Sequence, residues 1–337
     1  MSEPLLSIRD LEVTFPVRLP GSWPWTPAAR LQAVKGVSLD LAPGETLGLV
    51  GESGSGKSTF ARAVVGTIPA TGGQVIWNGQ DLAALSPARR RAHRAEVQMV
   101  FQDPLAALDP RMTVGASIAE PLQTHRPGMD RAGRRRLVGE TMERVGLAPA
   151  MMDRYPHEFS GGQCQRVGIA RALVLGPRLI VADEPVSALD VSVQAQVVNL
   201  MKALVADTGC SLIFIAHDLS VVRNVSDRIA VMYLGRLMEV APAGPLVAGP
   251  AHPYAHALIE AVPIPDPARE RGRKHHAPSG EIPSPLSPPS GCVFRTRCPR
   301  AEEDCAREVP PMRAVGPGMA ACHHPVVGSV AEEAVAG

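Results

Sequence analysis

The stretch at residues 51–59 carries the residue types and the spacing that bind phosphate groups. Its sequence, GESGSGKST, matches the pattern G-x-x-x-x-G-K-S/T at every fixed position. Glycine suits this role because the backbone must wrap closely around the phosphates, in dihedral angles that a Cβ would hinder. Lys57 would add a positive charge at the β- and γ-phosphates, and the Ser58 hydroxyl would ligate Mg²⁺. The pattern predicts a nucleoside triphosphate site formed by Gly51, Ser53, Gly54, Ser55, Gly56, Lys57, Ser58 and Thr59.

A flexible loop rich in glycine and serine is the alternative for this stretch, and its flanks argue against it. Residues 46–50 predict a short buried strand, and residues 59–65 predict a helix that opens directly out of the glycines. Strand, loop and helix in this order are the context that the phosphate-binding pattern requires. The N-terminus of the helix would also direct its positive dipole toward the phosphates.

Two acidic residues end another apolar run. Residues 179–182 predict a strand, and Asp183 and Glu184 follow it directly. In phosphate-loop proteins the aspartate at this strand end reaches the Mg²⁺ shell, so Asp183 and Ser58 are the expected metal ligands. Glu184 is placed to orient or deprotonate the water that attacks the terminal phosphate. Paired acids at a strand end are common, so this assignment depends on their combination with Lys57 and Ser58.

Gln102 and His217 end two further predicted strands, at residues 97–102 and 211–216. A glutamine beside a phosphate loop could bind Mg²⁺ or orient a water, and a histidine there could contact the γ-phosphate. Either residue alone is more often solvated or structural. The hypothesis of a role in chemistry comes from their positions at strand ends on the phosphate side.

A second anion site is predicted where Ser160, Gly161, Gly162 and Gln163 lead into a helix at residues 165–173. The serine suits an N-cap, and the two glycines leave backbone N–H groups open at the helix start. An ordinary helix cap with a flexible lead-in explains the same residues. Both accounts stay open on the residues alone.

The remaining patterns predict the elements that position these residues. Residues 5–15 and 33–41 read as strands separated by a Pro-rich loop at 16–27, and residues 72–79 as a strand that runs into an Asn-Gly turn. This N-terminal part is antiparallel in character and is expected to lie against a parallel core. Residues 104–159 turn mostly helical and are expected to form an inserted helical subdomain.

Composition and charge limit the class of protein. The 337 residues are 45% apolar and 20% charged, which is typical of a globular protein, and the net charge of +1 gives no reason to expect nucleic acid as a partner. No run of 18 apolar residues occurs, and the N-terminus lacks the basic and apolar regions of a signal peptide. We therefore expect a cytosolic protein, docked on a membrane at most.

Four of the six cysteines lie in the last 46 residues and need a separate explanation. From about residue 263 the composition shifts to proline, serine and charge, so we divide the chain into domains at 1–262 and 263–337. The second is small and poor in large apolar residues, so a staple is expected. Disulfides are not expected in the cytosol, and the spacing lacks the C-x2-C pairs of common zinc sites. The cysteines concerned are Cys292, Cys298, Cys305 and Cys322.

With these motifs in this order, the chain resembles the nucleotide-binding subunits of ATP-binding cassette (ABC) transporters over residues 5–325. By that resemblance residues 51–59 are the Walker A loop, Gln102 belongs to the Q-loop, and Asp183 with Glu184 ends the Walker B strand. The resemblance implies an α/β fold of the P-loop NTPase type. It consists of a RecA-like core, an antiparallel β subdomain, an inserted helical subdomain and, here, a small cysteine-containing C-terminal module.

The other motifs of the family follow the same resemblance. Residues 160–163 are the signature motif, Asp190 closes the D-loop, His217 is the switch histidine, and Phe15 is placed to stack on adenine. In the family two cassettes pack head to tail, and the signature motif of one closes over the γ-phosphate held by the other. The resemblance thus accounts for two anion sites on one chain. It implies ATP and Mg²⁺ as ligands, with catalysis by Lys57, Gln102, Glu184 and His217.

Longer stretches are similar to the dipeptide/oligopeptide importer branch of the family, at residues 101–112, 155–160, 182–190 and 252–254. The branch implies a subunit that powers import of peptides or a related small solute from the cytoplasmic face of the membrane. Its partners would be a second cassette (a paralogue or a copy of this chain), two transmembrane permease subunits and an extracytoplasmic solute-binding protein. One departure is Cys164, where the family usually carries Arg, Gln or Lys. We expect at most an altered rate from it.

The same branch has a C-terminal region with the pattern Gly-Cys-x-Phe-x-x-Arg-Cys-Pro, here residues 291–299. Its four cysteines can hold a [4Fe-4S] cluster, which the resemblance favours for this chain. A zinc ion and unoccupied thiols stay open as alternatives.

Two other functions are compatible with an ABC cassette. One is a soluble ATPase that acts on nucleic acid or ribosomes, which the near-neutral charge and the single cassette disfavour. The other is a regulatory role for the C-terminal module as a redox sensor, which could coexist with transport.

Overall fold

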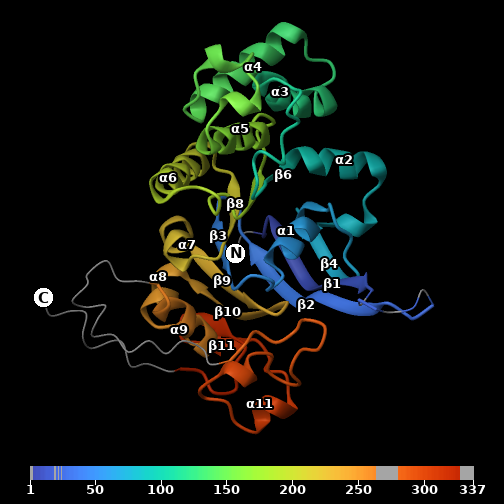
Figure 1. Cartoon of the computed structure of the whole chain (residues 1–337), viewed down its shortest axis with the longest axis vertical. Helices are drawn as coiled ribbons and strands as arrows, with labels where there is room; N and C mark the ends of the chain where they lie inside the picture. The colour runs from blue at the N-terminus through green and yellow to red at the C-terminus, as the bar shows by residue number, and fades with distance from the viewer. Residues whose placement is uncertain (1–2, 19, 22, 24, 263–279, 327–337) are drawn as a thin grey trace, which may run out of the picture.

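A computed structural model describes residues 3–18, 20, 21, 23, 25–262 and 280–326. Figure 1 shows a helical region at one end of the long axis, a large sheet in the middle and a C-terminal module at the other end. The predicted linker at 263–279 lies outside the described residues. No helix in the described part of the chain has the length and apolar character to cross a membrane.

The central sheet has eight strands in the order β11-β12-β10-β9-β3-β8-β7-β6. Its parallel part carries the strands on which the sequence motifs were placed, with β9 beside them. They are β3 (Thr46–Val50), β6 (Val97–Val100), β7 (Leu179–Asp183), β8 (Ser211–Ala216) and β9 (Arg228–Tyr233). Strands β3, β7 and β8 are buried along their whole length, because both faces of a parallel sheet are covered.

Alternate residues of these strands enter two different cores. On β8, Leu212 and Phe214 pack with the helical side of the molecule, whereas Ile213 and Ile215 pack with α1 (Lys57–Val65) and the N-terminal sheet. This follows from the two-residue period of a strand, which sends successive side chains to opposite faces. The helices on the first side are α6 (Val191–Thr208), α7 (Leu219–Val225) and α8 (Ala243–Ala248).

The N-terminal sheet is antiparallel, in the order β2-β1-β4-β5, as predicted. Its strands are β1 (Leu6–Val17), β2 (Ala29–Leu41), β4 (Gly72–Trp77) and β5 (Gln80–Asp81). The turn between β4 and β5 is the predicted Asn-Gly pair, with φ of 49° at Asn78 and 77° at Gly79.

One expectation about this sheet was wrong, because Pro16 does not end the first strand. It pairs with Arg30, and β1 continues to Val17. The pairing of β1 with β4 has already ended at Glu12 and Gly72, so Pro16 lies where β1 has a neighbour on one side only. A proline is tolerated there because its missing N–H is not needed by a second strand.

The inserted region contains α3 (Val114–His125), α4 (Arg131–Arg144) and two short 3-10 turns (Pro149–Met151 and Pro156–Glu158). These pack on α5 (Gly161–Leu173), which follows the insertion. Residues such as Ile118 and Met142 are completely buried between the helices. The helix α2 (Pro87–Glu96) precedes β6 and lies beside α3.

The C-terminal module, residues 280–326, is attached to the central sheet. Its strands β11 (Arg313–Val315) and β12 (Gly318–Ala320) extend the sheet beyond β10 (Arg236–Pro242), through pairing of Glu239 with Ala320 and Val240 with Met319. Its remaining regular elements are a 3-10 turn (Arg295–Arg297) and the short helix α11 (Asp304–Arg307). The helix α9 (Pro253–Glu260) precedes the undescribed segment.

Candidate nucleotide site

The phosphate loop, residues 51–59, connects β3 to α1 as predicted. Two of its glycines are required by close neighbours. A Cβ on Gly51 would lie 2.1 Å from the Met232 carbonyl oxygen, and one on Gly56 would lie 2.3 Å from that of Ala33. The loop is thus pressed against β2 and the end of β9, which fixes its path.

Lys57 is buried and directed back over the loop. Its Nζ donates hydrogen bonds to the carbonyl oxygens of Gly51 at 2.7 Å and Glu52 at 3.0 Å. Burial lowers the pKa of this ammonium, and the nearby carboxylates of Glu184 and Asp183 oppose that shift. An anionic phosphate in the loop would favour the charged form further.

Glu184 is the point on which the predicted catalytic residues converge. Gln102 donates a hydrogen bond from Nε2 to Glu184 Oε2 at 3.0 Å, while Lys57 Nζ and His217 Nδ1 each lie 3.9 Å from a Glu184 carboxylate oxygen. The backbone of Glu184 has a φ of 46°, in the left-handed region that non-glycine residues rarely adopt. Such strain persists only where its surroundings enforce it, and it is common at active sites.

Ser58 and Asp183 lie together, as the sequence predicts for two ligands of one Mg²⁺. The Ser58 hydroxyl donates a hydrogen bond to Asp183 Oδ1 at 2.9 Å. Burial raises the pKa of Asp183, while the bond from Ser58 acts in the opposite direction. A buried carboxylate beside a hydroxyl is a donor set that a hard, oxygen-seeking cation satisfies.

A cavity of about 390 Å³ lies over the loop. Phe15 of β1, Gln102 and Glu184 are among the residues that line it. Its other walls include the loop residues Ser53, Gly54, Ser55, Gly56, Lys57, Ser58 and Thr59. The structure therefore brings the predicted adenine platform, the phosphate loop and the attacking-water residue to one cavity.

The predicted signature residues do not line this cavity. Ser160 caps α5, accepting a hydrogen bond from the Gln163 N–H at 3.3 Å, and Gln163 accepts one in return from the Ser160 N–H at 2.9 Å. Gly161 at this helix start is exposed. Asp190 is likewise absent from the cavity lining and caps α6. One chain thus holds the predicted triphosphate loop and, outside its cavity, a helix that begins with two glycines.

Comparison with known proteins gives this arrangement a family. A family model described as "ABC transporter" matches residues 34–187, and one described as "Oligopeptide/dipeptide transporter, C-terminal region" matches residues 238–305. The oligopeptide transport ATP-binding protein OppF of Escherichia coli (strain K12) is 57% identical over 306 residues, which cover 91% of this chain and 92% of that protein. The chain belongs to the ABC transporter family of ATP-binding subunits.

Other members of the ABC family agree. OppF of Haemophilus influenzae is 52% identical over 309 residues, covering 92% of this chain and 93% of that protein. The dimeric MJ0796 cassette bound to ADP and Pi superposes with a TM-score of 0.62 at 28% identity, over 71% of this chain and 98% of that chain. CbiO1 of Clostridium perfringens, with a TM-score of 0.62 at 23% identity, shares the fold. The chain is accordingly an ATPase subunit of an ABC importer, which favours transport over the nucleic-acid alternative.

Sequence reasoning missed two functional candidates in this ABC cassette. Glu52 is a variable position of the phosphate-loop pattern, so nothing in the motif marks it. It forms an ion pair with Arg297 of the C-terminal module, with 2.7 Å between Glu52 Oε2 and the guanidinium. A signal did exist, because Arg297 is the arginine inside the cysteine pattern at residues 291–299. Its partner 245 residues away could not be read from that pattern.

The four C-terminal cysteines are brought together. Cys292, Cys305 and Cys322 are buried and Cys298 is half-buried, and none forms a disulfide. Burial raises the pKa of Cys322 to about 11, and the other three cysteines add to that shift through their charge. Cys164, by contrast, is fully buried in the core of the helical region, with its Sγ 3.5 Å from the Pro156 carbonyl oxygen.

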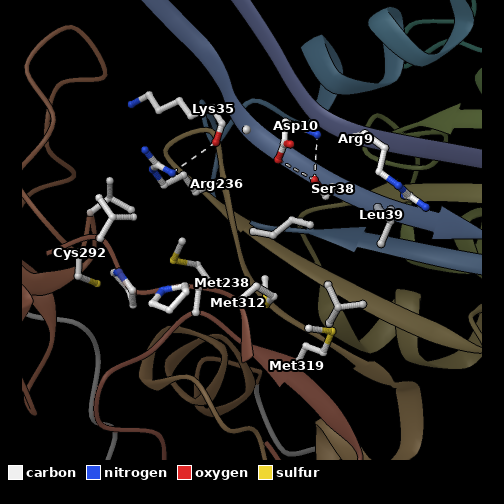
Figure 2. Close-up of a pocket in the computed structure, with 18 of the residues that line it drawn as sticks. Arg9, Asp10, Lys35, Ser38, Leu39, Arg236, Met238, Cys292, Met312 and Met319 are labelled. Atoms are coloured by element: carbon white, nitrogen blue, oxygen red, sulfur yellow. Dashed lines mark hydrogen bonds between the residues drawn. The ribbon is translucent and has the colours of Figure 1, made fainter. Parts of the chain in front are cut away.

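A larger cavity, of about 560 Å³, lies away from the phosphate loop. Figure 2 shows it between β2, β10 and the C-terminal module, with Lys35 and Arg236 on one wall and Cys292 on another. Within the described residues the buried Lys35 amine has no hydrogen-bond partner. Of these two cavities we assign the smaller one to the nucleotide, because it is the one lined by the phosphate loop and by Gln102 and Glu184.

Proposed function

We propose that this ATPase subunit powers the import of oligopeptides or a related small solute, and that the residues around Glu184 perform its hydrolysis. The observation that carries the residue roles is the convergence of Gln102, Lys57 and His217 on the Glu184 carboxylate. The peptide substrate is supported by the 57% identity to an oligopeptide transport protein and by the C-terminal family match.

The roles follow from chemistry and position. Lys57 and the loop N–H groups hold the β- and γ-phosphates, and Phe15 stacks on the base. Glu184 orients and deprotonates the attacking water, a role that suits a carboxylate whose hydrogen bond to Gln102 fixes its direction. His217 contacts the γ-phosphate from the end of β8. Stabilisation of charge on the transferring phosphoryl group by such fixed donors is the main source of rate in this reaction class.

Ser58, Asp183 and Gln102 would hold Mg²⁺. Ser58 and Asp183 fit this role because a buried carboxylate and a hydroxyl already lie 2.9 Å apart at the loop. When bound, the ion neutralises charge on the β- and γ-phosphate oxygens. The three side chains approach the loop from α1, β7 and the end of β6, so the site draws on three separate elements.

The proposed partners begin with a second cassette, which would bind at the exposed start of α5. Ser160, Gly161 and Gly162 would close over the γ-phosphate of a second cassette, and Gln163 and Asp190 would support that contact. We propose two permease subunits and, through them, an extracytoplasmic solute-binding protein, with this chain on the cytoplasmic face. Nucleic acid is not a proposed partner. A relative solved as a dimer with ADP and Pi supports the pairing of cassettes.

Co-purification from native membranes tests this function. The tagged chain should recover two multi-span proteins and a second cassette, and peptide supplied with the binding protein should stimulate ATP hydrolysis. Recovery of soluble partners or nucleic acid alone would overturn the transport assignment.

For the cysteines we propose a [4Fe-4S] cluster. In the described part of the chain one trio of potential ligand atoms lies within 4.8 Å of one another, and it is Asp304, Cys305 and His324. No three of the four cysteine sulfurs there meet that limit, whereas sulfurs that share one tetrahedral zinc ion lie about 3.8 Å apart. The wider spacing and the burial of three of the four cysteines fit the larger cluster. When bound, it would cross-link the module.

Anaerobic purification tests the cluster. A brown protein with about four irons per chain would support it. A colourless, iron-free protein with one zinc, or with four titratable thiols in the module, would replace it with the corresponding alternative.

A further inference from the structure

The C-terminal module reaches the phosphate loop through a partly buried ion pair. The Arg297 guanidinium donates two parallel hydrogen bonds to the Glu52 carboxylate, at 2.7 Å to Oε2 and 3.0 Å to Oε1. The Arg297 side chain is 8% exposed and that of Glu52 is 23% exposed. Such a paired arrangement fixes direction as well as distance, because the planar guanidinium matches both carboxylate oxygens.

Aromatic residues from the cassette enclose this pair. Arg297 also donates to the Tyr233 hydroxyl at 3.4 Å, and its guanidinium carbon lies 5.9 Å from the centre of the Tyr233 ring. The Tyr254 hydroxyl accepts a hydrogen bond from the Glu52 N–H at 2.8 Å. Phe294 of the module packs against both tyrosine rings. The hydrogen bond to Glu52 raises the pKa of Arg297, so its charge is permanent.

Arg297 and Lys57 bind the same residue of the loop, because Glu52 accepts from Arg297 with its carboxylate and from Lys57 with its backbone carbonyl oxygen. Lys57 Nζ donates to the carbonyl oxygens of Gly51 and Glu52, so Lys57 holds the loop through its backbone and Arg297 holds it through the Glu52 side chain. Elsewhere the module pairs with the central sheet through β12 and β10, and it faces β2 and β10 across the 560 Å³ cavity of Figure 2. The ion pair with Glu52 is the contact through which the module touches the loop that receives the triphosphate.

We propose that Arg297 is a positioning residue of the ATP site, which sets the shape of the phosphate loop through Glu52 and couples it to the cysteine module. The coupling is direct along the chain, since Cys298 follows Arg297 and its N–H closes the same 3-10 turn on Arg295. The proposal rests on the assignment of residues 51–59 as the triphosphate loop. It does not depend on which metal, if any, the cysteines hold.

A purely structural ion pair is the competing account, and it predicts a different result. Arg297→Met in the full-length chain should raise KM for ATP by about tenfold, the effect expected for loss of a charged hydrogen bond, with a smaller effect on kcat. Glu52→Gln, which keeps the side-chain shape and leaves the module intact, should shift KM in the same direction. The matched control is Arg295→Met, in the same turn, whose guanidinium contacts Ser290 and not the loop.

Two further measurements make the test decisive. The exchanged pair Glu52→Arg with Arg297→Glu should recover part of the lost ATP affinity, and effects of the single variants should be non-additive. Hydrogen exchange at residues 292–298 should slow when a non-hydrolysable ATP analogue binds the parent protein, and this protection should vanish in Glu52→Gln, because coupling between two sites is reciprocal.

The outcomes separate the two proposals. If Lys57→Ala binds ATP normally, the loop assignment itself is wrong. If Lys57→Ala loses ATP while Glu52→Gln and Arg297→Met keep the parent KM and the same protection, the loop assignment stands and the positioning role of Arg297 is overturned. Should Arg297→Met fail to fold, Glu52→Gln alone decides between these results.

Discussion

At the scale of single residues, the nucleotide site is a set of charges that hold one another in place. Glu184 accepts from Gln102 and lies within ion-pair distance of Lys57 and His217. Each of these groups is expected to contact phosphate or water once the nucleotide binds. Before the nucleotide binds, the Glu184 carboxylate thus pairs with the groups that are expected to contact the γ-phosphate or the attacking water.

Glu184→Gln and Lys57→Ala should separate binding from hydrolysis. The glutamine cannot take a proton from water, so ATP should still bind while kcat falls by about 10²-fold or more. The alanine removes the charge in the loop, so binding itself should be lost. Single-turnover hydrolysis and nucleotide-binding titrations would measure both. Hydrolysis at the parent rate by the glutamine variant would contradict the role given to Glu184.

At the scale of elements, the start of α9 depends on a buried histidine, His252. His252 belongs to the His-Pro-Tyr stretch that the sequence resemblance singled out, but its structural role appears only in the fold. Its Nδ1 accepts a hydrogen bond from the Tyr254 N–H at 3.0 Å and so caps α9. Complete burial lowers its pKa from 6.5 to about 3.

This buried cap should make stability depend on pH. The unfolded chain takes up a proton near pH 6.5 and the folded chain does not until about pH 3, so the free energy of unfolding should fall as pH decreases between these values. The slope from this group approaches about 1.4 kcal/mol per pH unit. His252→Asn keeps a capping oxygen and cannot titrate, so urea unfolding of the variant from about pH 7 to about pH 4 should show a shallower dependence. Equal slopes would refute the assignment.

The sequence predicted the elements better than their limits and their long-range contacts. The phosphate loop, the strands β7 and β8 and the Asn-Gly turn follow from local pattern, because their residue types are fixed by local geometry. The extension of β1 past Pro16 depends on where its second neighbour ends, which no local pattern contains. The ion pair of Glu52 with Arg297 was missed for the same reason, since tertiary packing alone brings residues this distant together.

At the scale of the whole molecule, the proposed pairing would give each cassette half of two composite sites. The α5 N-terminus lies outside its own nucleotide cavity, and Gly161 there is exposed. A Cβ on Gly161 would meet only Leu189 Cδ2, at 3.7 Å, which is ordinary contact. A substitution at this position should therefore leave the fold unchanged and affect a second cassette alone.

Gly161→Asp should abolish ATP-dependent pairing of cassettes. The new carboxylate would face the γ-phosphate of the partner and repel it, whereas ATP binding to the loop of the same chain should persist. Size-exclusion chromatography in the Glu184→Gln background would measure pairing, with Gly128→Asp as a control in an exposed turn. Normal dimerisation of the Gly161 variant would remove the signature residues from the interface.

The joining of β12 to β10 has a consequence for how this protein can be shortened. A chain ending at Val262 would retain Phe15, the phosphate loop, Glu184 and His217, and so every residue proposed to touch ATP. It would also uncover the N–H and C=O groups through which Glu239 and Val240 pair with β12. A bare strand edge recruits other edges, so such a fragment should form concentration-dependent aggregates despite a complete catalytic set. Light scattering of the fragment against the full-length chain would measure this, and a monodisperse fragment would show that β12 is dispensable as a cover.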